Sequence, residues 1–417
     1  MSDWRHSGSL FLAGSGGPSH PHPAGGHVAV TLGFGSAFSW EMAALTLWSF
    51  ERATVDATPF TSLVVLTDTP EQLDRHRAKV AQLRVQAYNL TALQALERID
   101  RTLLPQDAVW FRFLLQARYI ARYCQRSELV LLFDLKDILF GSSPFVLAPR
   151  SSATGRVHNT LTSFTEMYIL RRGSWNYKMM LPFNTTYPGL ADDIVQRQLV
   201  GLNDGLLLGP PRIVERHARR LGSGVTGVQP PPKRLDGLDQ GLHNLLVYQK
   251  LLKSVGATET EDERAPSSEA QGTVDLGVPP YTLIQMTSNA SCPVLTMHML
   301  DANLYTCDEV DRDAPGSSVF RLRSVSTGQP FIIVHQWNRA PETVLRAVLC
   351  HHRHLLSLPR LRCGSKTACH PFRPERSLVR QDEREVLHKL VYPTIWRSMC
   401  PPSGCVTNED DRIRMYT

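Results

Sequence analysis

Two aspartates stand three residues apart, directly after a strongly apolar segment. Asp134 and Asp137 open and close the run DLKD, and the residues before it read LVLLF. Carboxylate oxygens are ligands that Mn2+ and Mg2+ prefer, and such an ion can neutralise a departing diphosphate. The alternative is that Asp134 caps a turn while Asp137 pairs with Lys136 or a nearby arginine. Because D-x-x-D is a common pattern, this segment alone leaves both interpretations open.

A histidine and an arginine follow another short apolar run, FIIV. The chain continues HQWNR, so His335 would stand at a strand end and Arg339 four residues later. A neutral imidazole at that position could be a third metal ligand, and a guanidinium could hold a phosphate. A lone histidine can equally be a structural residue of the core.

Two further segments combine amides, carboxylates and glycine. Asn203 and Gly205 belong to NDGLLLG, where glycine permits a ligand to approach the backbone and the amide offers hydrogen bonds, although a plain turn explains the segment equally well. Asp239 and Gln240 stand at the start of a helix predicted over 239–252. There they could orient sugar hydroxyls or stabilise a developing positive charge. The alternative is an aspartate N-cap followed by exposed amides.

Alternating strands and helices must position these residues. Apolar runs and helical spacing predict, in chain order, a strand over 27–33, a helix over 39–52, strands over 63–67 and 84–88 with a helix over 70–83 between them, a helix over 109–126 and a strand over 128–133. This order implies an α/β fold with a Rossmann-like, mixed but mostly parallel sheet flanked by helices. In such sheets ligands bind beyond the carboxyl ends of the strands, and Asp134 stands directly past one of them.

Composition favours a folded enzyme over a nucleic-acid-binding protein. The chain has 417 residues, is 42% hydrophobic and carries a formal charge of +6 that is spread along the sequence. A core of this size folds by itself, and a scattered basic surplus does not predict nucleic-acid binding. No stretch reaches the roughly 18 apolar residues that a membrane span needs.

Segment composition divides the chain into four parts. Residues 1–26 are rich in Gly, Ser, Pro and His and predict a disordered leader, so any membrane anchor would have to be a missing N-terminal segment. An alternating strand and helix pattern covers 27–145, and a less regular mixture of aromatic and polar residues over 146–345 suits an acceptor-facing half. Two segments of the second half, 222–233 and 258–275, are rich in Gly, Pro or charge and predict mobile loops. Residues 346–417 form a cysteine-containing extension.

Cysteines and glycosylation sequons bear on the compartment. Four of the eight cysteines cluster at 363, 369, 400 and 405 within the C-terminal extension, and they favour disulfides over a zinc site because their spacing lacks C-x2-C pairs. N-x-Ser/Thr sequons begin at Asn89, Asn184 and Asn289. Together they favour the lumen of the Golgi or endoplasmic reticulum, with the cytoplasm as the alternative.

Four motifs together carry a resemblance to a known family. They read LLFDLKDILFGSSPF (131–145), LNDGLLLG (202–209), DQGLHNLL (239–246) and IVHQWNR (333–339). In type and order they resemble motifs of glycosyltransferase-A-fold nucleotide-sugar glycosyltransferases, particularly those of algae, plants and protists. The resemblance spans about 28–345 and leaves the C-terminal extension uncovered.

The resemblance implies a sugar transferred from a nucleoside-diphosphate donor, most simply a UDP-sugar, to a glycan, protein or lipid acceptor. It implies Mn2+ or Mg2+ as the cofactor, with Asp134, Asp137 and His335 as ligands. Asn203 and Gly205 would then lie by the donor sugar, and Asp239 and Gln240 by the reacting centre. The chain departs from the usual pattern at Asp204, where serine is common, and this adds a charge beside the donor sugar.

Two other functions compete with this one. A catalytically inactive carbohydrate-binding protein on the same fold would not need both aspartates, the DQ pair and His335. A nucleotidyltransferase usually carries a glycine-rich loop with Arg or Lys after its first strand, whereas this chain has GFGSAFSWE with no basic residue there. Both therefore rank below a glycosyltransferase.

Overall fold

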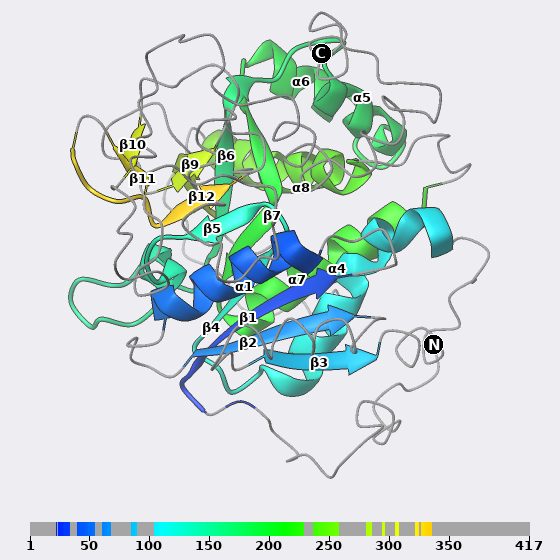
Figure 1. The fold of residues 1–417 in the computed structure, drawn as a ribbon. Helices are drawn as coiled ribbons and strands as arrows, with labels where there is room; N and C mark the ends of the chain where they lie inside the picture. Colours follow the sequence, from blue (N-terminus) through cyan, green and yellow to red (C-terminus); the bar gives the residue numbers. More distant parts are fainter. Residues whose placement is uncertain are drawn as a thin grey trace, which may run out of the picture.

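A seven-stranded sheet forms the centre of the protein (Figure 1). The computed structural model describes residues 22, 24–33, 40–54, 61–67, 85–89, 104–228, 237–257, 281–285, 294–296, 305–307, 322–324 and 327–335. The strands follow the order β3-β2-β1-β4-β7-β6-β8. Their bounds are β1 His27–Gly33, β2 Thr61–Thr67, β3 Val85–Asn89, β4 Leu129–Phe133, β6 Leu161–Ile169, β7 Val200–Gly209 and β8 Tyr281–Gln285.

One strand runs against the others. β1, β2, β3 and β4 pair in parallel, as do β6 and β8, whereas β7 is antiparallel to both of its neighbours. The predicted mixed, mostly parallel α/β sheet is therefore confirmed. Every residue of β2 and β4 is buried, as expected for parallel strands that are covered on both faces.

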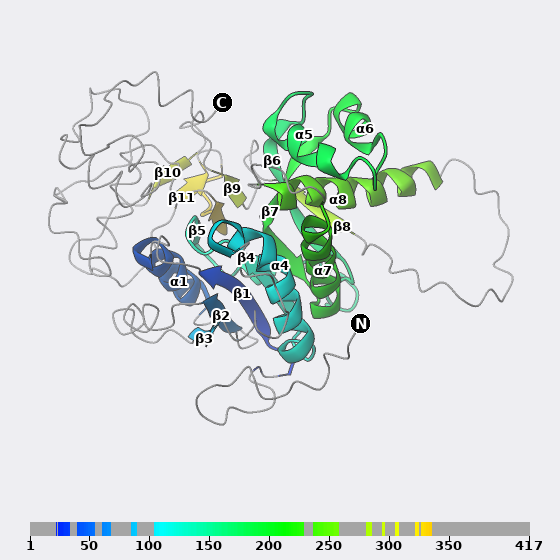
Figure 2. The same ribbon diagram turned by 90° about the vertical axis from the view of Figure 1, so that its right-hand side faces the viewer.

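Helices cover both faces of the sheet. α1 lies on one face, while α4 and α7 pack together on the other (Figure 2). α8 packs on β7 and on α5. The helices are α1 Trp40–Thr54, α4 Leu104–Tyr123, α5 Trp175–Met180, α6 Leu190–Gln196, α7 Pro211–Thr226 and α8 Leu238–Ala257, with short 3-10 helices η3 Pro144–Leu147 and η4 Leu181–Phe183.

Two smaller sheets complete the described structure. β5 (Ile138–Phe140), β12 (Ile333–His335) and β9 (Val294–Thr296) form one, and β10 (Tyr305–Cys307) pairs with β11 (Leu322–Ser324) in the other. β12 is antiparallel to β5, with His335 opposite Ile138. Because β5 begins one residue after Asp137, this pairing brings the late histidine to the aspartates.

The predicted loop over 222–233 is wrong in its first part. α7 continues through Thr226, so its glycines are helical. A Cβ added at Gly222 would overlap Leu114, and one at Gly224 would overlap Leu242. These glycines therefore allow close helix packing on α4 and α8 and do not break the chain into a loop.

The N-terminal boundary also differs from the sequence interpretation. His22 falls within the predicted leader of 1–26, but its side chain is 4% exposed and its Nε2 lies 2.6 Å from the Tyr119 hydroxyl of α4. Burial lowers the pKa of His22 to about 4. Folded structure therefore includes part of that leader.

Several predictions lie outside the described residues. They concern Arg339, the helix over 70–83, the loop over 258–275, the extension 346–417 with its cluster of cysteines, and the sequon at Asn289. Among the residues that the structure does describe, no helix is long and apolar enough to cross a membrane.

Candidate functional site

Three predicted metal ligands meet at the carboxyl edge of the sheet. Asp134 follows β4 directly, Asp137 ends the turn that leads into β5, and His335 ends β12. Each offers one ligand atom, and these atoms all lie within 4.8 Å of one another. Two carboxylates and one imidazole at this separation fit a divalent cation such as Mn2+ or Mg2+.

Gly205 makes room for the first aspartate. It lies inside β7, so the segment around Asn203 and Gly205 is a strand interior and the turn interpretation is wrong. The Asp134 backbone N–H donates to the Gly205 carbonyl over 3.0 Å. A Cβ at Gly205 would overlap the Asp134 carboxylate, so this position needs glycine for the aspartate to take its place.

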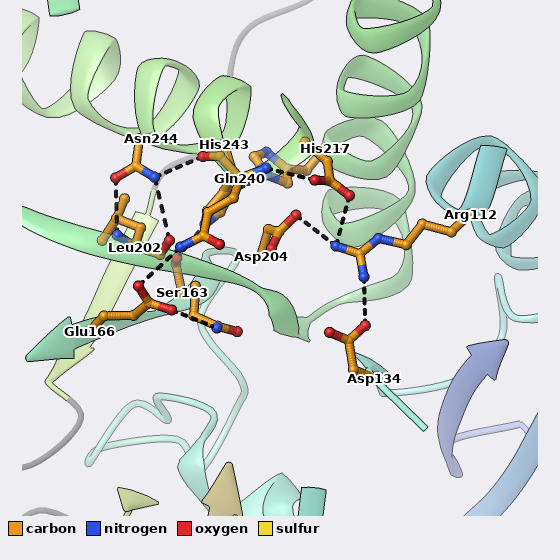
Figure 3. A network of polar contacts seen from close by, with 12 residues as sticks. Arg112, Asp134, Ser163, Glu166, Leu202, Asp204, His217, Gln240, His243 and Asn244 are labelled. Atoms are coloured by element: carbon orange, nitrogen blue, oxygen red, sulfur yellow. Dashed lines mark hydrogen bonds and ion pairs between the residues drawn. The ribbon is translucent and has the colours of Figure 1, made fainter. Parts of the chain in front are cut away.

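Arg112 of α4 joins three carboxylates from three different elements. Its Nη1 donates to Asp134 Oδ1 over 2.6 Å and its Nη2 to Asp204 Oδ2 over 2.7 Å. The same Nη2 lies 2.9 Å from Asp239 Oδ2. Figure 3 shows the guanidinium between Asp134 and Asp204. A planar, forked cation suits this arrangement, since one group can face several carboxylates at once.

The electrostatics of this cluster reflect one cation among several acids. Burial lowers the pKa of Arg112, but the charges of Asp134, Asp239 and Asp204 outweigh that effect and raise the pKa overall. Burial, with Asp239 nearby, raises the pKa of Asp204 well above its usual range despite the contact with Arg112. Asp204 is thus a buried partner of Arg112, which accounts for the extra charge noted in the sequence.

Glu166 of β6 connects the amide residues of the site. Its Oε1 accepts from Asn203 Nδ2 and its Oε2 from Gln240 Nε2, each over 3.0 Å. The Gln240 amide also lies 3.4 Å from the Tyr168 hydroxyl, and Asn203 Nδ2 lies 3.4 Å from His335 Nε2. One carboxylate therefore fixes two predicted sugar-side residues relative to the metal-side histidine.

The first turns of α8 are anchored in the core. Asp239 is 4% exposed, and its Oδ1 accepts from the Gln240 backbone N–H over 3.0 Å. Asn244 is fully buried and bonds the backbone of Leu202, with its Oδ1 3.0 Å from the Leu202 N–H (Figure 3). The alternative of exposed amides after an N-cap is therefore wrong for this helix.

A buried hydrogen-bonded chain lies behind α8. Ser163 Oγ is 2.8 Å from His243 Nε2, His243 Nδ1 is 2.8 Å from His217 Nε2, and His217 Nδ1 is 2.9 Å from the Tyr281 hydroxyl. Burial lowers the pKa of His243 to about 3 and that of His217 well below its usual value. Both imidazoles are neutral, and the chain ties α7 and α8 to β6 and β8.

Sequence reasoning missed Arg112 and Glu166. Each is a charged residue inside an otherwise apolar or aromatic segment, WFRFLL and LTSFTEMYI. A charge in such a segment predicts a buried partner, and that was the available signal. Arg339, predicted to hold a phosphate, lies outside the described residues.

The comparisons with known proteins return glycosyltransferases. No protein-family model and no curated protein matches the sequence. Mouse xyloside xylosyltransferase 1 is 10% identical at a TM-score of 0.40 and covers 76% of this chain and 99% of its own. An active-site mutant of LgtC is 14% identical at a TM-score of 0.39, and the match covers 74% of this chain and 86% of LgtC. The bifunctional glycosyltransferase WbbM is 12% identical at a TM-score of 0.34, and the match covers 56% of this chain and 39% of WbbM. At these similarities the matches do not assign a function to this chain.

Proposed function

We propose that this protein is a metal-dependent glycosyltransferase that moves a sugar from a nucleoside-diphosphate donor, most simply a UDP-sugar, to a glycan, protein or lipid acceptor. The observation that carries the proposal is the meeting of Asp134, Asp137 and His335 beyond the carboxyl ends of the strands. That edge is where α/β sheets bind nucleotide ligands.

The charges support a divalent cation there. Arg112 supplies one positive charge against three carboxylates, and Asp137 adds a fourth acid beside Asp134. Gathering this many acids around one base is costly unless some of them are protonated, as the raised pKa of Asp204 indicates, or a cation joins them. An inactive carbohydrate-binding protein would gain nothing from such a cluster, which is typical of working sites.

Each residue then has a physical role. Asp134, Asp137 and His335 would hold Mn2+ or Mg2+, which when bound would neutralise charge on the diphosphate. Asp239, fixed by Arg112, would face the reacting sugar with a preorganised negative charge. Gln240 and Asn203, held by Glu166, would donate or accept at sugar hydroxyls.

The test compares nucleotide binding with turnover. A screen of UDP- and GDP-sugars with Mn2+ identifies the donor by its hydrolysis, and calorimetry measures UDP binding. Asp134→Ala, Asp137→Ala and His335→Ala should abolish Mn2+-dependent UDP binding. Asp239→Ala should keep that binding and lower turnover about 10^2 to 10^3-fold, as expected for the loss of one preorganised electrostatic group.

A surface aspartate provides the matched control. The Asp193 side chain is 41% exposed and pairs with Arg197 one helical turn away, so Asp193→Ala should behave as wild type. Full turnover of Asp134→Ala in the presence of EDTA would refute the metal assignment. Asp239→Ala binding UDP as poorly as His335→Ala would refute the division of roles.

We also infer the lumen of the Golgi or endoplasmic reticulum as the compartment. Of the three sequons, Asn184 lies on an exposed segment after η4 and would be accessible to glycosylation. Mass spectrometry of the native protein should find glycan at Asn184, whereas a bare asparagine and free cysteines throughout would indicate the cytoplasm.

A further inference from the structure

An exposed tryptophan of α5 lies against the start of α8, the helix that carries Asp239 and Gln240. Trp175 is the first residue of α5 and is 48% exposed, which is unusual for the largest apolar side chain. By contrast, Trp48 of α1 is 3% exposed and packs in the core. A large ring left half in solvent marks a candidate binding surface.

Two glycines at the start of α8 allow α5 and this ring to approach closely. Gly237, with φ of +85°, lies directly against the Trp175 ring, and a Cβ there would overlap the indole. One turn later a Cβ at Gly241 would overlap the Met179 backbone carbonyl of α5. α5 therefore sits in close backbone contact with α8, and the indole lies directly on the backbone at Gly237.

The ring therefore lies at the end of α8 that also carries Asp239 and Gln240. Gly237 and Asp239 are two residues apart, so their Cα atoms are separated by no more than about 7.6 Å. Charged groups belong to the same segment: Arg172, three residues before the tryptophan, pairs with Asp192 over 3.0 Å, and both are largely exposed. Tyr177 also donates to Asp192, over 2.9 Å.

We propose that the indole of Trp175 is the surface on which a neutral sugar ring of the acceptor stacks, next to the donor sugar held near Asp239. This rests on the proposed glycosyl transfer. The C–H groups on one face of a pyranose form an apolar patch, and they meet the electron-rich face of an indole favourably. Charged and amide groups nearby then form hydrogen bonds with the hydroxyls at the edge of the same ring.

The test observes Trp175 directly in the protein labelled with 5-fluorotryptophan. Its fluorine resonance is assigned as the one that disappears in Trp175→Phe. Maltose, cellobiose, lactose and xylobiose are then titrated in turn, with and without UDP and Mn2+. At least one of them should shift the Trp175 resonance saturably, while the resonance of buried Trp48 stays in place.

Kinetics with the sugar that binds give a second measurement. Trp175→Ala should raise the KM for that acceptor roughly tenfold, the loss expected for one aromatic contact, with a much smaller change in UDP affinity. Trp175→Phe should recover part of the loss because it keeps an aromatic face. Val146→Ala, which shortens another exposed apolar side chain on η3, should leave the acceptor KM unchanged.

Failure of this inference and failure of the proposed function give different results. If UDP and Mn2+ bind but no sugar moves the Trp175 resonance, the proposal of a stacking surface is wrong and the proposed transferase function is unaffected. If a sugar shifts the resonance but UDP does not bind, the surface stands as a carbohydrate-binding site and the transferase is wrong. A resonance that moves only with protein concentration would make Trp175 a contact between copies of the chain and overturn the inference.

Discussion

Replacement of Arg112 by methionine tests whether one guanidinium holds the site together. The side chain is 15% exposed and faces Asp134, Asp204 and Asp239 at 2.6, 2.7 and 2.9 Å. Methionine keeps the length and apolar character of the stem but leaves three carboxylates facing one another. Removing one partner of a buried ionic group costs about 3–5 kcal/mol, because the remaining charges lose their compensation.

Urea unfolding measures this cost. With a denaturant slope of about 3 kcal/mol/M, the loss lowers the midpoint by about 1 M or more. Arg197→Met is the matched control, because Arg197 pairs with Asp193 on the exposed side of α6 and such pairs contribute less than about 1 kcal/mol. The urea midpoint of Arg112→Lys should lie between those of Arg112→Met and Arg197→Met, since an ammonium keeps the charge but not the forked group that contacts carboxylates on both sides.

Mn2+ separates a local electrostatic effect from a packing effect. A cation held by Asp134 would relieve part of the repulsion that Arg112→Met creates, so Mn2+ should raise the midpoint of this variant more than that of wild type. Two results would refute the reasoning. One is a midpoint for Arg112→Met equal to that of Arg197→Met, and the other is a loss of stability that Mn2+ leaves unchanged.

Two further predictions concern glycine and histidine. Gly205→Ala should fold but weaken Mn2+ binding at least about tenfold, because the new methyl overlaps the Asp134 carboxylate. β7 cannot shift to relieve the overlap, since it is paired on both sides. Wild-type Mn2+ affinity of this variant in calorimetry would contradict the prediction. His217 and His243 have pKa values far below the ordinary 6.5, so the unfolded chain takes up their protons first as the pH falls. Their contribution to the free energy of unfolding is complete above pH 6.5. Below pH 6.5 it is lost at about 1.4 kcal/mol per pH unit for each histidine. Urea midpoints between pH 7 and 5 should therefore fall less steeply in His217→Gln, and equal slopes in the two proteins would count against neutral histidines.

The elements nearest the site could be predicted because their local signals agree. The strand predicted over 27–33 matches β1, and LVLLF is β4, since continuous apolar runs of this length suit strands covered on both faces. Asp134 and His335 were each placed directly after an apolar run, and Asp137 three residues after Asp134. His335 reaches the aspartates through the pairing of β12 with β5 in the separate three-stranded sheet. Helix limits were less accurate: α4 begins at Leu104 and not at 109, because no capping residue marks its start.

Contacts between distant elements could not be predicted in the same way. Arg112 is 22 residues before Asp134 and 127 before Asp239, and no local pattern connects them. The glycines of α7 were assigned to a loop because glycine lowers helix propensity, yet the gain from close packing on Leu114 and Leu242 outweighs that cost. The pairing of His217 with His243 depends likewise on how α7 meets α8.

The direction of β7 explains why Asn203 and Gly205 reach the site at all. In the antiparallel register Phe133 pairs with Leu206, so Gly205 stands opposite Asp134 at the carboxyl edge of β4. In a parallel strand the residues at this edge would be those near Gly209, and Asn203 would lie about 20 Å away at 3.3 Å per residue. A polar NDG segment ahead of the apolar half of a strand can therefore reach the ligand edge when the strand runs away from that edge. The sequence therefore predicts that β7 runs antiparallel to β4, but only when NDG and Asp134 at the end of LVLLF are considered together.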